Sequence, residues 1–99
     1  MIAAISLTFE WDEDKAAENL AKHGVGFDEA AETFADDRAV EYFDPEHSNE
    51  DERRYARVAL SYSRLLFVVY TERGDAVRII HARKPSKRMQ EDYEEQNRS

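Results

Sequence analysis

The sequence has no cysteine, only two prolines and three glycines, and no long hydrophobic run. Without cysteine the chain can form neither disulfides nor thiolate zinc sites, and it has no thiol nucleophile. The longest apolar run, residues 65–70, falls far short of the roughly 20 residues that a membrane-spanning helix needs. Residues 1–11 lack the basic start and the apolar length of a signal peptide. We therefore expect a soluble protein of a reducing cytoplasm.

The length and composition predict a single small domain over residues 1–99. Domains usually contain about 100–150 residues, so a chain of 99 has no room for a second one. Hydrophobic residues make up 41% of the chain and charged residues 36%, which places it among globular proteins at the polar end.

Charge is distributed unevenly, although the net charge is −8. Residues 1–52 contain 16 acidic and 3 basic side chains, whereas residues 53–88 contain 2 acidic and 10 basic ones. A basic block in an acidic chain indicates a surface for a polyanion such as RNA. Salt bridges between the two halves are the alternative explanation.

The apolar pattern predicts an α+β fold with the order β-α-α-β-β-β-β-α. A strand over 5–11 precedes a helix that begins at the cap Asp12 and ends at Gly24, with Ala16, Leu20 and His23 as its buried stripe. A second short helix is expected from the cap Asp28 to about Phe34. The remaining predicted elements are strands over 39–43, 54–61, 65–71 and 77–83, a loop over 44–51, tight turns at 61–64 and 72–75, and a helix from 86 to about 96. Because strands and helices come in separate runs, the sheet should be mostly antiparallel, and we assign Tyr55, Tyr62, Phe67 and Tyr70 to its core.

Several phrases in a fixed order resemble one family of small bacterial proteins. They are Phe9–Lys15, Asn19–Val25 with Phe27, Asp44-Pro45 with His47-Ser48, Glu52 with Arg54-Tyr55, Arg64–Leu66 with Val69–Gly74, Arg78–Ile80, and Ala82–Lys84. The ordered set, from about residue 8 to residue 95, is similar to the BrnT family, the toxin half of a type II toxin–antitoxin pair. The chain departs from the family pattern at Ala59 and Ser63, which replace glycines, at Arg53, which replaces an acid, and in having fewer arginines after Lys84.

This resemblance implies a fold and an activity. BrnT proteins have a RelE-like fold, a small twisted antiparallel sheet with helices packed on one side, and act as metal-independent ribonucleases that inhibit translation and need no cofactor. The expected partners are RNA and a cognate BrnA-type ribbon-helix-helix antitoxin, through which operator DNA is contacted indirectly. A dimer within a toxin–antitoxin hetero-oligomer is a further expectation.

Metal-free RNA cleavage requires groups that move protons and cations that stabilise the charge on the phosphorane. We predict that Arg83 and Lys84 stabilise phosphate, because they end a strand and arginine matches phosphate geometry. His23 and Glu52 are the candidates for proton transfer, although His23 also has the position of a helix cap. The expected RNA-binding residues are Lys22, Arg54, Arg57, Lys87, Arg88 and Tyr93. Each has a structural alternative: packing for Tyr93, and a solvated charged surface for the basic residues.

Two rival functions follow from other features of the sequence. The acidic first half suits a basic protein partner, so a non-catalytic interaction module of the same family is the main alternative. The spacing of Asp44, His47 and Glu50 resembles that of metal ligands, but no glycine-shaped loop or cysteine supports a metal site there.

Overall fold

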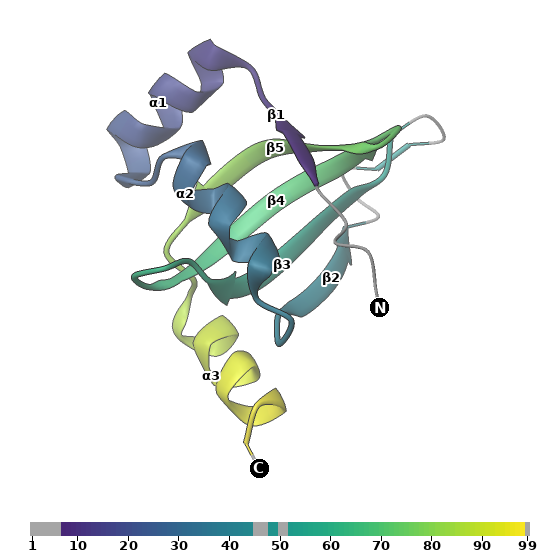
Figure 1. Ribbon diagram of the computed structural model, residues 1–99. Coiled ribbons are helices and arrows are strands. Elements are labelled where there is room, and N and C mark those ends of the chain that lie inside the picture. Colours follow the sequence, from purple (N-terminus) through teal and green to yellow (C-terminus); the bar gives the residue numbers. More distant parts are fainter. Residues whose placement is uncertain (1–6, 45–47, 50–51, 99) are drawn as a thin grey trace, which may run out of the picture.

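The computed structural model describes residues 7–44, 48–49 and 52–98, and in this part the predicted element order is confirmed. The elements are β1 (Thr8–Glu10), α1 (Glu13–His23), α2 (Phe27–Glu32), the short 3₁₀ helix η1 (Thr33–Ala35), β2 (Val40–Asp44), β3 (Arg54–Leu60), β4 (Leu65–Arg73), β5 (Ala76–Arg83) and α3 (Lys87–Gln96). The five strands form one sheet in the order β1-β5-β4-β3-β2 (Figure 1). All neighbours are antiparallel except β1 and β5, which are parallel. The fold is therefore α+β with a mixed, mostly antiparallel sheet.

The core lies between α2 and one face of the sheet, here called the α2 face. Strand pairing places Tyr55, Val68, Tyr70 and Ile79 on this face, because side chains alternate along a strand. The buried cluster that they join is Val25, Phe27, Ala30, Leu66, Val68, Tyr70, Val77, Ile79 and Ala82. The ring of Phe34 extends the cluster by an edge contact with Tyr70 at 4.9 Å between centroids. The second helix is thus confirmed, but the predicted cap Asp28 was wrong: the helix begins at Phe27, its N-cap is Gly26, and Asp28 lies in its first turn.

The first helix has the expected ends but not the expected buried stripe. The Asp12 carboxylate accepts a hydrogen bond from the Lys15 amide at 3.0 Å, and Gly24 ends the helix in the left-handed conformation with φ 69°. Leu20, however, is 55% exposed, whereas Asn19 is buried. The prediction was wrong at Leu20 because α1 lies along the edge of β5 and turns a polar residue toward the sheet.

The last helix departs from the expectation that all helices lie on one side. Its cap is Ser86, whose hydroxyl accepts from the Met89 amide. Tyr42 lies between two β2 residues of the α2 face, so its side chain points to the opposite face of the sheet, here called the α3 face. There it donates a hydrogen bond to Asp92 of α3 at 3.1 Å. Helix α3 therefore packs against the α3 face. The α2 face is covered by α2 and bordered by α1 (Figure 1).

The turns are confirmed, but Phe67 and Tyr62 are not in the core as we expected. Phe67 is half-buried on the α3 face, because it alternates with the core residues Leu66 and Val68. The Ser61 amide donates to the Arg64 carbonyl at 2.8 Å, and Gly74 takes a φ of 61° in the β4–β5 hairpin. Tyr62 is 84% exposed, because it stands at the tip of the turn between β3 and β4. No helix in the described ranges is long and apolar enough to cross a membrane.

Candidate active site

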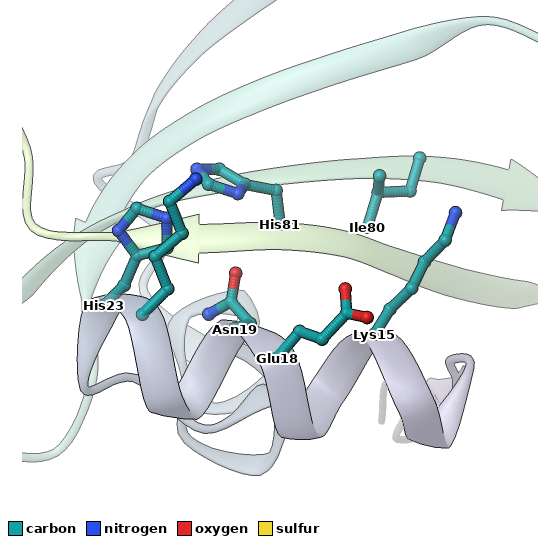
Figure 2. Close-up of a pocket in the computed structure, with 7 residues that line it drawn as sticks. Lys15, Glu18, Asn19, His23, Ile80 and His81 are labelled. Carbon is teal, nitrogen blue, oxygen red and sulfur yellow. The ribbon is translucent and has the colours of Figure 1, made fainter.

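Two neighbouring grooves follow β5 on the side where α1 meets the sheet. The first, of about 360 Å³, is lined by Lys15, Glu18, Asn19, Lys22, His23, Ile80 and His81 (Figure 2). The second, of about 120 Å³, is lined by Asp12, Lys15, Glu52, Arg54, Arg78, Ile79 and Ile80. Because Lys15 and Ile80 line both, the grooves form one continuous strip.

Asn19 fixes α1 against β5. Strand β1 pairs with β5 only as far as Arg78, so beyond this point no strand among the described residues neighbours this edge of β5. The Asn19 side chain replaces it: its Nδ2 donates to the Ala82 carbonyl at 2.8 Å, and its Oδ1 accepts from the Ala82 amide at 3.2 Å. Nδ2 also donates to the Val25 carbonyl at 2.9 Å, which holds the chain after the helix. These bonds position the next turn of α1, with His23, over the end of β5.

Two histidines meet in the first groove. The rings of His23 and His81 contact edge to face, with centroids 4.9 Å apart. Burial lowers the pKa of His81 below its ordinary value of 6.5, and the positive charges of His23, Arg83 and Lys22 lower it further. His81 is therefore neutral near pH 7 and can accept a proton.

Arg83 accompanies His81 on the same face of β5. His81 is paired with Val69 and Arg83 with Phe67, so both side chains lie on the α3 face. The Arg83 guanidinium stacks 4.4 Å from the centroid of the Phe67 ring and donates from Nη1 to the Lys84 carbonyl at 3.1 Å. This fixes a cation beside the histidines, with exposed Lys84 following it at the end of the strand.

The second groove brings together side chains of both charges. Arg54 and Arg78 flank Thr71 across three adjacent strands. The Glu52 carboxylate accepts from Arg54 Nε at 3.2 Å, and Arg78 lies 3.7 Å from the Glu10 carboxylate.

Comparison with known families gives a match that covers both grooves. The family model described as ribonuclease toxin, BrnT, of type II toxin–antitoxin systems matches residues 11–88. The chain belongs to the BrnT family. A search of curated proteins finds no match. The function of this family is that of a ribonuclease toxin, and a type II toxin has a cognate antitoxin as its partner.

The structure brings together about half of the residues that we predicted for a BrnT site. His23 and Lys22 line the first groove, and Glu52 and Arg54 line the second. Arg83 stands beside the first groove, close enough for its charge to act on His81. Glu52 and His23 line different grooves, so the two candidates for proton transfer are not neighbours.

The other predicted residues lie elsewhere. Arg57 is buried on the α2 face, where it lies over the Phe34 ring at 4.4 Å and pairs with Glu41 at 3.3 Å. Tyr93 donates to the Asp36 carboxylate at 2.7 Å, and burial together with this hydrogen bond raises the pKa of Tyr93 to about 12. Arg88 pairs with Asp92 within α3, and Lys87 is exposed in the same turn. Packing thus accounts for Arg57 and Tyr93, and we leave both out of the proposed RNA surface.

Six polar residues of the strip were not predicted as site residues from the sequence. They are Asp12, Lys15, Glu18, Asn19, Arg78 and His81. The sequence did contain a signal for His81. It lies two residues before Arg83 on the same predicted strand, and side chains two positions apart on a strand point to the same face. His47 and Glu50 of the candidate metal cluster lie outside the described residues, so that hypothesis stays a prediction; among the described residues no group of three or more metal-ligating side chains is found.

Proposed function

We propose that this BrnT protein is a metal-independent endoribonuclease whose reaction takes place in the first groove. The observation that supports the proposal best is the contact between His23 and His81 in an open groove that also carries Lys22 and is bordered by Arg83. Cleavage of RNA without metal needs two groups that move protons and at least one cation near the phosphate. The groove supplies all three.

The proposed reaction uses the 2′-hydroxyl of the RNA as nucleophile. His81, neutral at pH 7, takes the 2′-hydroxyl proton while O2′ bonds to phosphorus. The bond from phosphorus to O5′ breaks, and His23 in its protonated form gives a proton to O5′. Arg83 and Lys84 stabilise the charge on the phosphorane oxygens, and Lys22 binds the adjoining phosphate. The products are a 2′,3′-cyclic phosphate and a 5′-hydroxyl.

Proton transfer is assigned to the histidines rather than to Glu52. Glu52 lies in the second groove and already accepts a hydrogen bond from Arg54. It is therefore not beside the phosphate that the first groove would hold. The pair of histidines therefore fits the reaction better.

The proposal extends to partners and location. Free toxin would inhibit translation by cutting RNA in the cytoplasm, and a BrnA-type ribbon-helix-helix antitoxin would neutralise it. Operator DNA would be contacted through that antitoxin. The strongly acidic first half of the chain supports binding of a basic protein segment.

The test is cleavage of a long end-labelled RNA by purified, antitoxin-free protein in EDTA. We expect cuts that leave 2′,3′-cyclic phosphate ends and that disappear when the nucleotide 5′ of the cut carries 2′-deoxyribose. His81→Gln should slow cleavage by on the order of 10²–10⁴-fold, and Arg83→Ala by on the order of 10²–10³-fold.

Arg38→Ala is the matched control, because Arg38 is exposed and lies outside both grooves. Urea unfolding of each variant shows that the fold is intact. Cleavage that requires a divalent metal, or that survives unchanged in both groove variants, contradicts the proposal. Binding of antitoxin without any cleavage or growth arrest would favour the interaction module.

A further inference from the structure

The second groove has a chemistry that differs from that of a phosphate site. Its charged lining consists of the cations Lys15, Arg54 and Arg78 and of the carboxylates Asp12 and Glu52. Glu10 adds a further carboxylate 3.7 Å from Arg78. Carboxylates repel a phosphate, so a site for phosphate alone would not place them in its wall. The lining instead offers hydrogen-bond acceptors and donors side by side.

Glu52 and Arg54 form a fixed pair with unused hydrogen-bonding capacity. Arg54 donates from Nε to Glu52 Oε1, and the Arg54 amide donates to the Ser48 hydroxyl at 2.8 Å, which anchors the start of β3. Both side chains are roughly one third exposed, at 34% for Arg54 and 38% for Glu52. In the described part of the chain, Glu52 Oε2 and the terminal Arg54 nitrogens have no hydrogen-bond partner. These atoms can therefore bind a ligand without breaking a bond.

We propose that the second groove is a subsite for a guanine base of the RNA, bound by Glu52 and by the guanidinium groups of Arg54 and Arg78. Guanine presents the adjacent donors N1–H and N2–H₂, which match the two oxygens of a carboxylate, and the acceptors O6 and N7, which match arginine. Adenine places its N1 acceptor where guanine has N1–H, so it opposes the carboxylate. Ile80, which is half-buried and lines the groove, provides apolar wall for the base plane.

The position of the groove gives this subsite a role in substrate choice. It adjoins the groove of the histidines through Lys15 and Ile80, so a base bound here belongs to a nucleotide next to the cleaved bond. The expected consequence, preferred cleavage beside guanine, rests on the proposed function. The binding of guanine itself can be tested without cleavage.

The cleavage test uses oligonucleotides with one ribonucleotide, flanked on either side by guanine, inosine or adenine. We expect wild-type protein to prefer guanine over adenine by about tenfold or more at one flanking position. Inosine should fall between them, because it lacks the N2 amino group. Glu52→Gln should reduce the ratio of guanine to adenine about tenfold, since an amide cannot accept at both atoms.

Glu72→Gln is the control, because Glu72 is exposed on β4 and lines neither groove. If Glu52 instead moved protons, Glu52→Gln would slow all substrates by the same factor and leave the ratio unchanged, which would overturn the inference. A wild-type ratio near one would overturn it as well.

A binding experiment separates the subsite from the proposed function. Guanosine and adenosine monophosphates are titrated into ¹⁵N-labelled protein, and amide shifts are followed at Arg54 and Arg78. Shifts that saturate with the guanosine nucleotide at least about fivefold more tightly, and that lose this difference in Glu52→Gln, support the subsite even if no RNA is cut. Equal shifts with both nucleotides would refute it even if the protein proves to be a ribonuclease.

Discussion

Asn19 is the residue on which the position of α1 depends. Its buried amide satisfies three backbone groups, of which two belong to Ala82 and one to Val25. In Asn19→Ala these groups lose their partners, and an unsatisfied buried group costs about 1–3 kcal/mol. We expect the free energy of unfolding, measured in urea, to fall by at least about 2 kcal/mol.

The neighbouring Leu20 gives the matched control for that measurement. Leu20 is 55% exposed, so Leu20→Ala should change the free energy of unfolding by no more than about 0.5 kcal/mol. If Leu20→Ala costs more than Asn19→Ala, the placement of α1 on β5 is wrong.

His81 makes stability depend on pH. Its pKa is lower in the folded protein than the ordinary 6.5, because of burial and of the charges of His23, Arg83 and Lys22. The unfolded chain therefore takes up a proton at a higher pH than the folded chain does. The stability that neutral His81 contributes is complete above pH 6.5 and is lost as the pH falls toward and through the folded pKa.

We expect wild-type protein to lose more stability than His81→Gln when the pH is lowered from about 8 to about 5.5. Urea unfolding at a series of pH values measures this difference. If the free energy of unfolding depends on pH in the same way in the two proteins, His81 has the same pKa in the folded and the unfolded chain, and this prediction is wrong.

Single residues of the site could be predicted only where the local sequence around them marked the end of a helix or a strand. Arg83 and His23 end recognisable elements, and their local position marked them as candidates. His81 and Asn19 could not be chosen in this way, because their roles depend on α1 meeting β5 across more than 50 residues of sequence. That contact exists because β1 is too short to cover the edge of β5, which local propensity does not reveal.

At the scale of elements, Arg64 joins the turn before β4 to α2 and α1. Its Nε and Nη2 donate to the Glu29 carboxylate at 2.8 and 2.7 Å, and Nη2 also donates to the Gly24 carbonyl at 3.0 Å. Arg64 lowers the pKa of Glu29 below 4.5, aided by the hydroxyls of Ser61 and Ser63. The contribution of ionised Glu29 to stability is thus present above pH 4.5 and is lost as the pH falls below it.

A double-mutant cycle with Arg64→Ala and Glu29→Gln measures this link. We expect a coupling free energy on the order of 1 kcal/mol near pH 7, because the pair is bidentate but partly exposed. The coupling should shrink as the pH falls below 4.5 and through the lowered pKa of Glu29, where the carboxylate takes up a proton. Arg73→Ala, which removes a more exposed arginine 3.8 Å from Glu10, should cost less than Arg64→Ala.

The elements themselves were predictable because caps, turns and alternation are local signals. Asp12, Gly24, Gly74 and Ser86 all occupy the positions expected of them. The pairing of β1 with β5 and the side on which α3 packs were not predictable, because both depend on contacts between distant segments. The parallel pairing nevertheless decides where β5 is left open for the first groove.

For the whole molecule, the uneven charge of the sequence becomes a division in space. Acidic residues dominate α2 and the segment before β2, whereas the arginines of β3 and β5 lie on the sheet. Several of these arginines are paired with acids, as Arg57 is with Glu41 and Arg64 with Glu29. Salt bridges between the two halves are thus confirmed for these residues, and Arg78 of the strip is paired with Glu10 in the same way, whereas binding of a polyanion along the strip stays a prediction.

The strip predicts how RNA binding depends on salt. A chain of net charge −8 can bind RNA only where cations are concentrated, and each phosphate contact with single-stranded RNA contributes about 0.7 to the slope of log K against log salt concentration. Lys22 lines the first groove, so Lys22→Ala should reduce the slope by about 0.7. Arg38→Ala removes an equal charge outside the strip and should leave the slope unchanged. Fluorescence anisotropy with 2′-O-methyl RNA, which cannot be cut, measures both slopes, and equal reductions would mean that RNA binds through overall charge rather than along β5.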